Sequence, residues 1–277
     1  MDELQKQNLA ERALAAAGCC LASRYAGAAF AYVTGSIMRG EGTTFSDIDL
    51  VVVFPSLQTA WRESFTEDGF PVEAFVHDPQ TLAHYLHADA ESRCPIMVNM
   101  VATGSIVGPN IERARAIQAK AAKVLAAGPK PLDGPSYDML RYQVTDLADD
   151  LRGARPPEEI AAISALLYQQ LADLILLGRG AWTGRGKWAP RLIRKLEPRL
   201  AAEFDTAFRL AVQGNSTRFL ALADRELDLH GGRCFNGFSR RLRWRRGGRK
   251  SICNIGECSR LDGRCLRPNS RMPLSRE

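Results

Sequence analysis

The sequence predicts an α+β fold, in which a small sheet with flanking helices is followed by a bundle of helices. Short runs of β-branched and aromatic residues occur at 30–34, 47–54 and 70–77, with helical patterns around them. From residue 111 onward nearly every segment has helical periodicity. Strands first and helices afterwards are typical of an α+β domain joined to a helical domain.

Periodicity and the flanking glycines predict each element of the N-terminal part. The Ala-rich stretch 4–29 contains few helix-breaking residues and predicts an amphipathic helix. A polar stretch at 56–68 is expected to hold a helix, and Gly69 separates it from the strand at 70–77. The other expected elements are helices at 81–90, 95–102 and 111–127 and a short strand at 105–107.

The C-terminal part is expected to be helical up to a basic tail. The helical patterns cover 137–152, 157–177, about 189–212 and 216–229. A cluster of glycines and prolines between residues 128 and 135 predicts a domain boundary. We therefore expect a first domain at 1–127, a helical domain at 128–239, and a tail at 240–277 that lacks periodic apolar residues and is predicted to be disordered.

Positive charge is concentrated in the tail. The net charge of the chain is +6, and residues 240–277 contain twelve Arg or Lys against three acids, a net of +9. Subtracting +9 from +6 leaves −3 for the other 239 residues. The sequence pI of about 9.0 therefore reflects the tail, and nucleic-acid binding is expected only there.

Composition favours a globular protein of a reducing compartment. Hydrophobic residues make up 45% and charged residues 25% of the chain, which is ordinary for a globular domain. The seven cysteines are odd in number and include the adjacent pair Cys19 and Cys20, which argues against a disulfide framework. The acidic start lacks a secretory pattern, and no apolar run is expected to span a membrane. We expect a cytoplasmic protein; its oligomeric state is not indicated.

The most informative segment runs from Gly35 to Leu50. It opens with a Gly-Ser turn after an apolar run and closes with Asp47 and Asp49 at the start of a strand. Side chains alternate along a strand, so the two carboxylates share one face while Ile48 points into the core. Carboxylates at this spacing can flank a pair of divalent cations about 4 Å apart. Without a cation they would repel each other and resist burial, so the pattern predicts metal ligands.

Four motifs together resemble the signature of the nucleotidyltransferase superfamily, which includes DNA polymerase beta and the aminoglycoside nucleotidyltransferases. That signature is a Gly-Ser pair, then Asp-hydrophobic-Asp, then a third acid on a later strand. The resemblance covers roughly residues 28–80 and implies a small mixed sheet flanked by helices. The matching motifs are Gly35-Ser36, Arg39-Gly40, Ser46-Asp47-Ile48-Asp49-Leu50 and Val72-Glu73-Ala74.

The resemblance implies transfer of a nucleoside monophosphate from a nucleoside triphosphate, expected to be ATP, to an acceptor hydroxyl with release of pyrophosphate. It implies a two-ion Mg²⁺ site in which Asp47, Asp49 and Glu73 are the ligands and catalytic residues. Glu73 either completes the second metal site or accepts the proton of the acceptor. The expected triphosphate-binding residues are Gly35, Ser36, Arg39, Ser46 and Lys187.

Several alternatives remain open from the sequence. Asp68 or Asp78 is an alternative to Glu73 as the third acid, and helical-domain acids are candidate general bases: Asp146, Asp149 and Asp150. The leading acceptor is a small hydroxylated molecule such as an aminoglycoside. The competing functions are a non-catalytic or partner-dependent protein of the toxin–antitoxin type and an RNA-modifying transferase that uses the basic tail.

Overall fold

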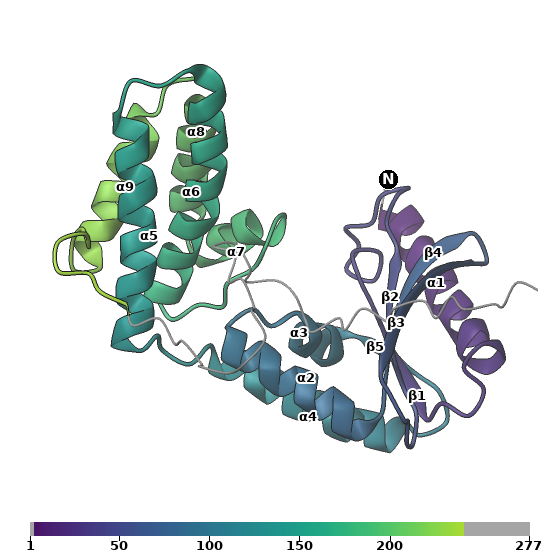
Figure 1. Ribbon diagram of the computed structural model, residues 1–277. Coiled ribbons are helices and arrows are strands. Elements are labelled where there is room, and N and C mark those ends of the chain that lie inside the picture. Colours follow the sequence, from purple (N-terminus) through teal and green to yellow (C-terminus); the bar gives the residue numbers. More distant parts are fainter. Residues whose placement is uncertain (1–2, 241–277) are drawn as a thin grey trace, which may run out of the picture. The chain divides into compact units, whose positions relative to one another are not determined.

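The computed structural model describes residues 3–240 (Figure 1). Of these, the residues up to Phe238 form one compact unit. The predictions for the tail after residue 240, namely disorder and nucleic-acid binding, lie outside the described residues.

A mixed five-stranded sheet forms the centre of the N-terminal part, in the order β3-β4-β2-β1-β5. β2 and β4 pair in parallel, whereas the other neighbouring strands pair antiparallel. The strands are β1 (Phe30–Thr34), β2 (Ile48–Val53), β3 (Trp61–Glu67), β4 (Phe70–His77) and β5 (Ser105–Val107).

Helices cover both faces of this sheet, which explains the continuous apolar run of β2. Leu50 and Val52 point to one face and share a core with α1 (Glu3–Ser23). Val51 and Val53 point to the other face and pack with the remaining N-terminal helices. Those helices are α2 (Pro79–Ser92), α3 (Ile96–Thr103) and α4 (Ile111–Ala127).

The C-terminal part is entirely helical within the described residues and has a core of its own. Large buried side chains such as Leu171, Phe204 and Phe219 belong to that core. The predicted fold class is therefore confirmed, while the domain boundary near residue 128 stays a prediction. The helices are α5 (Gly134–Arg152), α6 (Pro157–Gly178), α7 (Trp188–Leu196), α8 (Pro198–Val212) and α9 (Thr217–Leu229).

Helix α6 is long and apolar enough to cross a membrane by length and composition, contrary to the expectation that no segment would be. Of its most apolar stretch, 44% is buried inside the protein. Leu167, Leu171 and Leu174 of α6 are fully buried in the helical core. A helix at the centre of a bundle is apolar around most of its circumference, so packing accounts for this composition.

Two predicted elements were wrong. Residues 61–67 form the edge strand β3 rather than part of a helix, because Asp68 and Gly69 make a tight turn with φ of 48° and 78° that joins β3 to β4. Two consecutive positive φ values are typical of a type I′ hairpin, for which Asp-Gly is a favoured pair. The expected helix at 189–212 is two helices, because Pro198 cannot donate a helical hydrogen bond and starts α8 anew.

Candidate metal and nucleotide site

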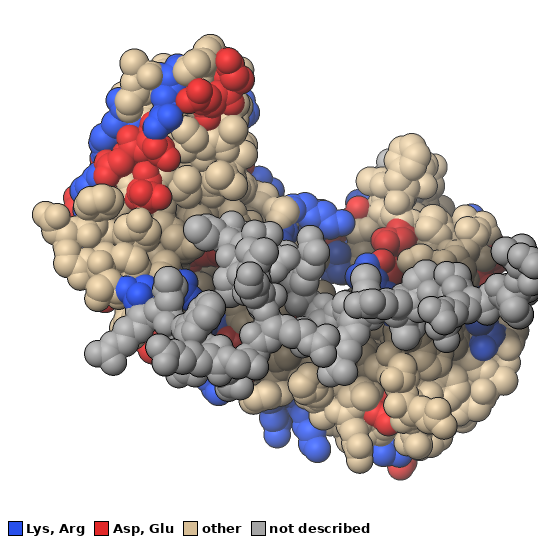
Figure 2. Space-filling model, in the orientation of Figure 1, with Lys and Arg blue, Asp and Glu red and all other residues tan. Residues whose placement is uncertain are grey.

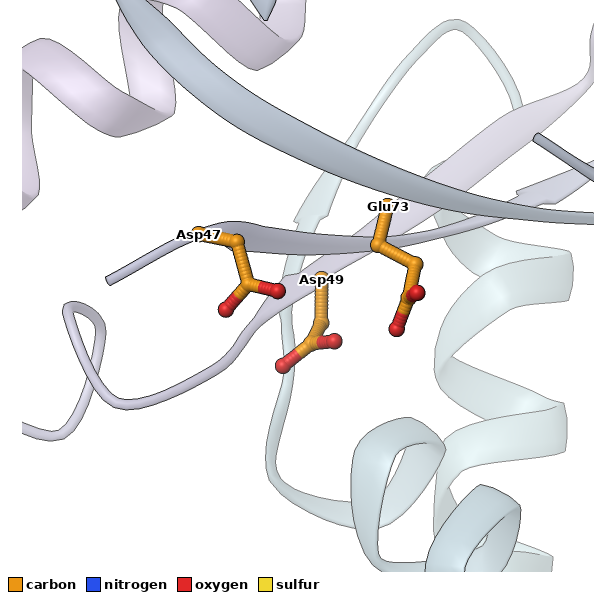
Figure 3. Close-up of side chains that lie close together, drawn as sticks. All are labelled: Asp47, Asp49 and Glu73. Carbon is orange, nitrogen blue, oxygen red and sulfur yellow. The ribbon is translucent and has the colours of Figure 1, made fainter. Parts of the chain in front are cut away.

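Three carboxylates gather at one end of the parallel strand pair (Figure 3). Asp47 directly precedes β2, Asp49 lies on β2, and Glu73 lies opposite Asp49 on β4. One carboxylate oxygen of each lies within 4.8 Å of the others, and all three side chains are half-buried. The three acids predicted from the sequence as metal ligands are therefore the ones that lie together within the described residues.

Strand alternation produces this gathering. Asp49 has the same orientation as Val51 and Val53, which pack against the helices α2 to α4, while Ile48 and Leu50 are fully buried in the core beside α1. The predicted division of β2 into an acidic face and a core face is therefore confirmed. Because β4 runs parallel to β2, its Glu73 is presented on the same face and at the same level.

Crowding of negative charge perturbs Asp49. Burial, together with the negative charges of Asp47 and Glu73, raises the pKa of Asp49 to about 6, although Arg39 and Lys187 act in the opposite direction. A divalent cation would relieve this repulsion, and carboxylate oxygens are the hard donors that Mg²⁺ takes. The donor set therefore fits such a cation.

Gly35 gives the backbone room beside this cluster. Its φ of +106° lies in a region that favours glycine. A Cβ atom at this position would lie 3.0 Å from Oδ2 of Asp49 and 3.3 Å from the carbonyl oxygen of Asp47. The turn after β1 therefore approaches the carboxylates more closely than a residue with a side chain would allow.

Ser36 and Ser46 join the two ends of the loop between β1 and β2. The Ser36 hydroxyl donates to Oγ of Ser46 over 2.8 Å, and that oxygen also accepts from the backbone N–H of Thr43 at 2.9 Å. Both predicted binding serines thus lie beside the acids, because Ser36 follows Gly35 and Ser46 precedes Asp47. Their hydroxyls are close enough together to contact one ligand group.

Positively charged side chains approach the site from two segments, the loop before β2 and the segment that begins α7. Arg39 donates to Glu41 at 3.3 Å, and its guanidinium lies 4.9 Å from the centre of the Trp188 ring. Arg191 pairs with the same Glu41 at 3.0 Å and lies 5.3 Å from the same ring. Lys187, directly before α7, is near enough to Asp49 to lower its pKa.

Sequence reasoning missed Arg62, Trp188 and Arg191 at this site. Arg62 on β3 forms an ion pair with Glu73, and it was missed because its segment was expected to be helical. The Asp68-Gly69 pair was the available signal, since a two-residue hairpin loop fixes the register of β3 against β4. Trp188 and Arg191 have no comparable local signal.

The two alternatives to Glu73, Asp68 and Asp78, lie outside the cluster that Asp47 and Asp49 form within the described residues. Asp78 is the N-cap of α2, where its carboxylate accepts from the backbone N–H groups of Gln80 and Thr81. These hydrogen bonds hold the pKa of Asp78 below its usual range. Asp68 lies in the turn between β3 and β4.

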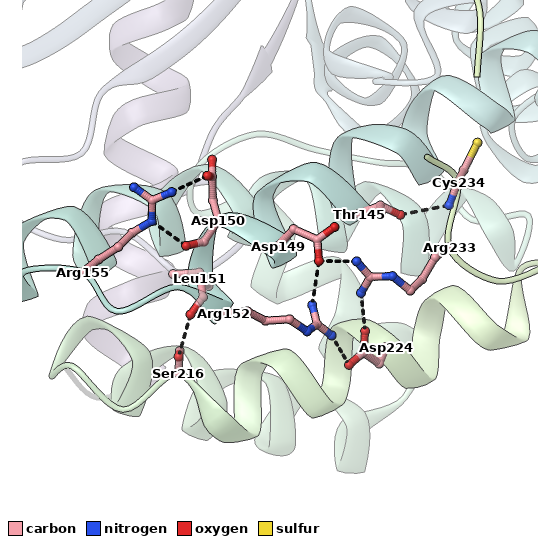
Figure 4. Close-up of polar contacts among 10 residues, drawn as sticks. All are labelled: Thr145, Asp149, Asp150, Leu151, Arg152, Arg155, Ser216, Asp224, Arg233 and Cys234. Carbon is pink, nitrogen blue, oxygen red and sulfur yellow. Dashed lines mark hydrogen bonds and ion pairs between the residues drawn. The ribbon is translucent and has the colours of Figure 1, made fainter. Parts of the chain in front are cut away.

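Two of the three helical-domain acids, Asp149 and Asp150, are engaged in ion pairs (Figure 4). Asp149 contacts Arg152 and Arg233, and Asp150 pairs with Arg155 at 2.5 Å. Asp146 is exposed on the same helix, α5. These ion pairs link α5 to its surroundings. A general-base role for the three acids stays a prediction.

Comparison with known proteins finds a nucleotidyltransferase domain in the part of the chain that holds the carboxylate cluster. Residues 20–93 match a family described as "Nucleotidyltransferase domain", and the chain therefore contains such a domain. Among solved structures, a nucleotidyltransferase-like protein from Exiguobacterium sibiricum 255-15 is 11% identical, with a TM-score of 0.41 over 78% of this chain and 76% of that one. No curated protein matches the sequence.

Proposed function

We propose that this protein is a Mg²⁺-dependent nucleotidyltransferase that moves a nucleoside monophosphate from a triphosphate, with ATP as the expected donor, to a hydroxyl of a small acceptor. The observation that carries the proposal is the cluster of Asp47, Asp49 and Glu73 beside the glycine turn of a nucleotidyltransferase domain. In the reaction, the acceptor oxygen bonds to the α-phosphorus, the bond to the β-phosphate breaks, and pyrophosphate leaves.

The residues of the loop would bind the triphosphate. At Gly35 the backbone can approach phosphate oxygens, and Ser36 and Ser46 place two hydroxyls beside it. Arg39 and Lys187 supply positive charge, the arginine as a planar fork and the lysine as a point charge. These groups orient the α-phosphate toward the acceptor.

The three acids would hold the cation. Asp47 and Asp49 present oxygens from one strand face, and Glu73 presents the third from the parallel strand. A cation held there would supply positive charge beside the transferred phosphate and the leaving pyrophosphate. Glu73 is either the third ligand or the group that takes the hydroxyl proton.

The charge of the body favours a small acceptor over a polyanion. The 239 residues before the tail have a net charge of −3, as noted above. On the part of the face that grey atoms leave visible in Figure 2, basic side chains occur in separate groups, some of them beside acidic ones. A cationic, hydroxylated molecule of the aminoglycoside type suits this balance better than RNA does.

Thermal-shift titration tests the nucleotide and metal site first. The full chain is titrated with ATP, GTP, CTP and UTP, with Mg²⁺ and with EDTA. We expect a Mg²⁺-dependent rise in the midpoint with at least one triphosphate. That rise is expected to be lost in Asp47→Asn and Asp49→Asn but kept in Asp68→Asn, a matched change in the β3–β4 turn, where Asn also accepts a positive φ.

The acceptor is then identified with the preferred triphosphate labelled on its α-phosphate. Transfer of label to an aminoglycoside, with one pyrophosphate released per product, would support the proposal. Full activity in either aspartate variant would contradict the assigned site. Transfer of label to RNA alone would favour the RNA-modifying alternative.

A further inference from the structure

Arg62 is a positive charge beside the carboxylate cluster that the proposed reaction does not use. It lies on the edge strand β3, where it is opposite Phe75 and diagonal to Glu73 on β4. Its guanidinium forms an ion pair with Oε1 of Glu73 and lies 4.8 Å from the centre of the Phe75 ring. The ion pair with Glu73 and the ring contact with Phe75 therefore keep the guanidinium of Arg62 beside the Glu73 carboxylate.

The exposure of this pair is unequal. The side chain of Arg62 is 60% exposed, whereas that of Glu73 is 24% exposed. Because most of the arginine side chain is already hydrated, separating the ion pair costs little free energy. The glutamate meanwhile remains in the cluster with Asp47 and Asp49. The pair is arranged so that Glu73 can exchange one positive partner for another.

We propose that Arg62 is an internal counter-ion that occupies Glu73 in the metal-free protein and competes with the divalent cation for it. The inference rests on the proposed metal site. A guanidinium and a divalent cation next to the same carboxylate repel each other, so each weakens the binding of the other. Arg62 thereby stabilises the metal-free cluster and lowers its affinity for the metal.

A purely structural role of Arg62 predicts the opposite change in metal affinity. If Arg62 served only to hold Glu73 in the geometry of a ligand, its loss would weaken metal binding. If it competes with the metal, its loss tightens binding. The sign of the change therefore separates the two roles without any measurement of catalysis.

The test is Mn²⁺ binding to the full chain, followed by electron paramagnetic resonance of the free ion. The variants are Arg62→Gln, Arg62→Lys, which keeps the charge, and Arg24→Gln. Arg24 is a matched control, because it pairs with Glu63 at 2.5 Å and lies 4.2 Å from the Phe65 ring, outside the three-acid cluster.

We expect Arg62→Gln to bind Mn²⁺ about three- to tenfold more tightly than the unsubstituted protein, a difference that shrinks as salt is raised. Arg62→Lys and Arg24→Gln are expected to remain within about twofold of it by the same reasoning. In EDTA the thermal midpoint of Arg62→Gln should be lower than that of the unsubstituted protein. With saturating Mn²⁺ the two midpoints should converge.

Each outcome has a separate meaning. If the unsubstituted protein binds Mn²⁺ and Arg62→Gln binds it equally or more weakly, the counter-ion role of Arg62 is overturned. The proposed metal site then remains supported. Absence of Mn²⁺ binding in both proteins would overturn the metal site and the counter-ion together. Binding that is detectable only in Arg62→Gln would support both, and circular dichroism checks that each variant is folded.

Discussion

At the scale of single residues, the site depends on the close approach of Gly35 to the carboxylates. The sequence pattern predicted Asp47, Asp49 and Glu73 because strand alternation and a family motif are both local features. It could not predict the 3.0 Å that would separate a Cβ at Gly35 from Asp49, since this distance depends on how β1 and β2 pair. The absence of a side chain at Gly35 thus allows the backbone to lie close to the Asp49 carboxylate.

Gly35→Ala is expected to disable the site more than it destabilises the fold. A Cβ at this position forces a strained φ and pushes against Asp49, so the Mg²⁺-dependent thermal shift with triphosphate should be lost. The backbone strain alone should cost about 1–2 kcal/mol of unfolding free energy. Gly27→Ala is the matched control, because Gly27 has φ of +91° and open space around its Cβ position.

Chemical denaturation and ligand titration of both variants separate the two effects. Similar losses of stability with ligand binding lost only in Gly35→Ala would support the assignment. Unchanged binding in Gly35→Ala would show that the turn does not need to approach the carboxylates so closely.

The raised pKa of Asp49 predicts how metal-free stability depends on pH. The folded pKa of about 6 lies above the ordinary value of 3.8, so the folded state binds the proton more tightly than the unfolded state does. The contribution of Asp49 to stability is therefore greatest below about pH 4 and is lost as pH rises through about 6. At about 1.4 kcal/mol per pKa unit, the loss is roughly 3 kcal/mol.

Urea denaturation in EDTA from pH 4 to pH 8 measures this loss as the difference between the unsubstituted protein and Asp49→Asn. We expect the variant to become relatively more stable across this interval. Saturating Mg²⁺ should reduce or reverse the difference, because the cation favours the charged carboxylate. A difference that does not vary with pH in EDTA would argue against a raised pKa.

At the scale of elements, the sequence was most informative where short-range patterns decide the structure. The strands at 30–34 and 70–77 were predicted with the bounds that the structure has, because glycines or turns limit both. The edge strand β3 was missed, since only alternate residues of Trp61–Glu67 are partly buried and its polar composition also suits a surface helix. That error concealed Arg62, so the contact of this arginine with Glu73 was not predictable.

At the scale of the whole compact unit, the residues of the candidate site come from segments that pack into different hydrophobic cores. The carboxylates lie on the sheet, whereas Lys187 and Trp188 belong to the segment that begins α7, whose Ala189 packs in the helical core. Glu41 and the Trp188 ring join Arg39 of the loop to Arg191 of α7. Sequence patterns predict each segment but not this contact, because it depends on tertiary packing over 150 positions of the chain.

Trp188→Leu is therefore expected to weaken triphosphate binding without unfolding either core. The ring lies against both Arg39 and Arg191, and its loss removes two cation–π contacts that restrict the orientation of the arginine in the loop. Contacts of this kind contribute about 0.5–1 kcal/mol each, so the loss of both should raise the dissociation constant roughly fivefold to thirtyfold. Fluorescent ATP analogue binding in Mg²⁺ measures this change, and chemical denaturation measures the stability.

Trp182→Leu supplies the comparison for this change. Trp182 lies six positions earlier and donates its indole N–H to the carbonyl oxygen of Leu125 at 2.8 Å, so its loss should lower stability and leave triphosphate affinity nearly unchanged. Equal weakening of binding in the two variants would mean that the general packing of this segment, rather than the arginine contacts of Trp188, controls the site. Weakening in Trp188→Leu alone would show that the helical part contributes to the nucleotide site by orienting Arg39.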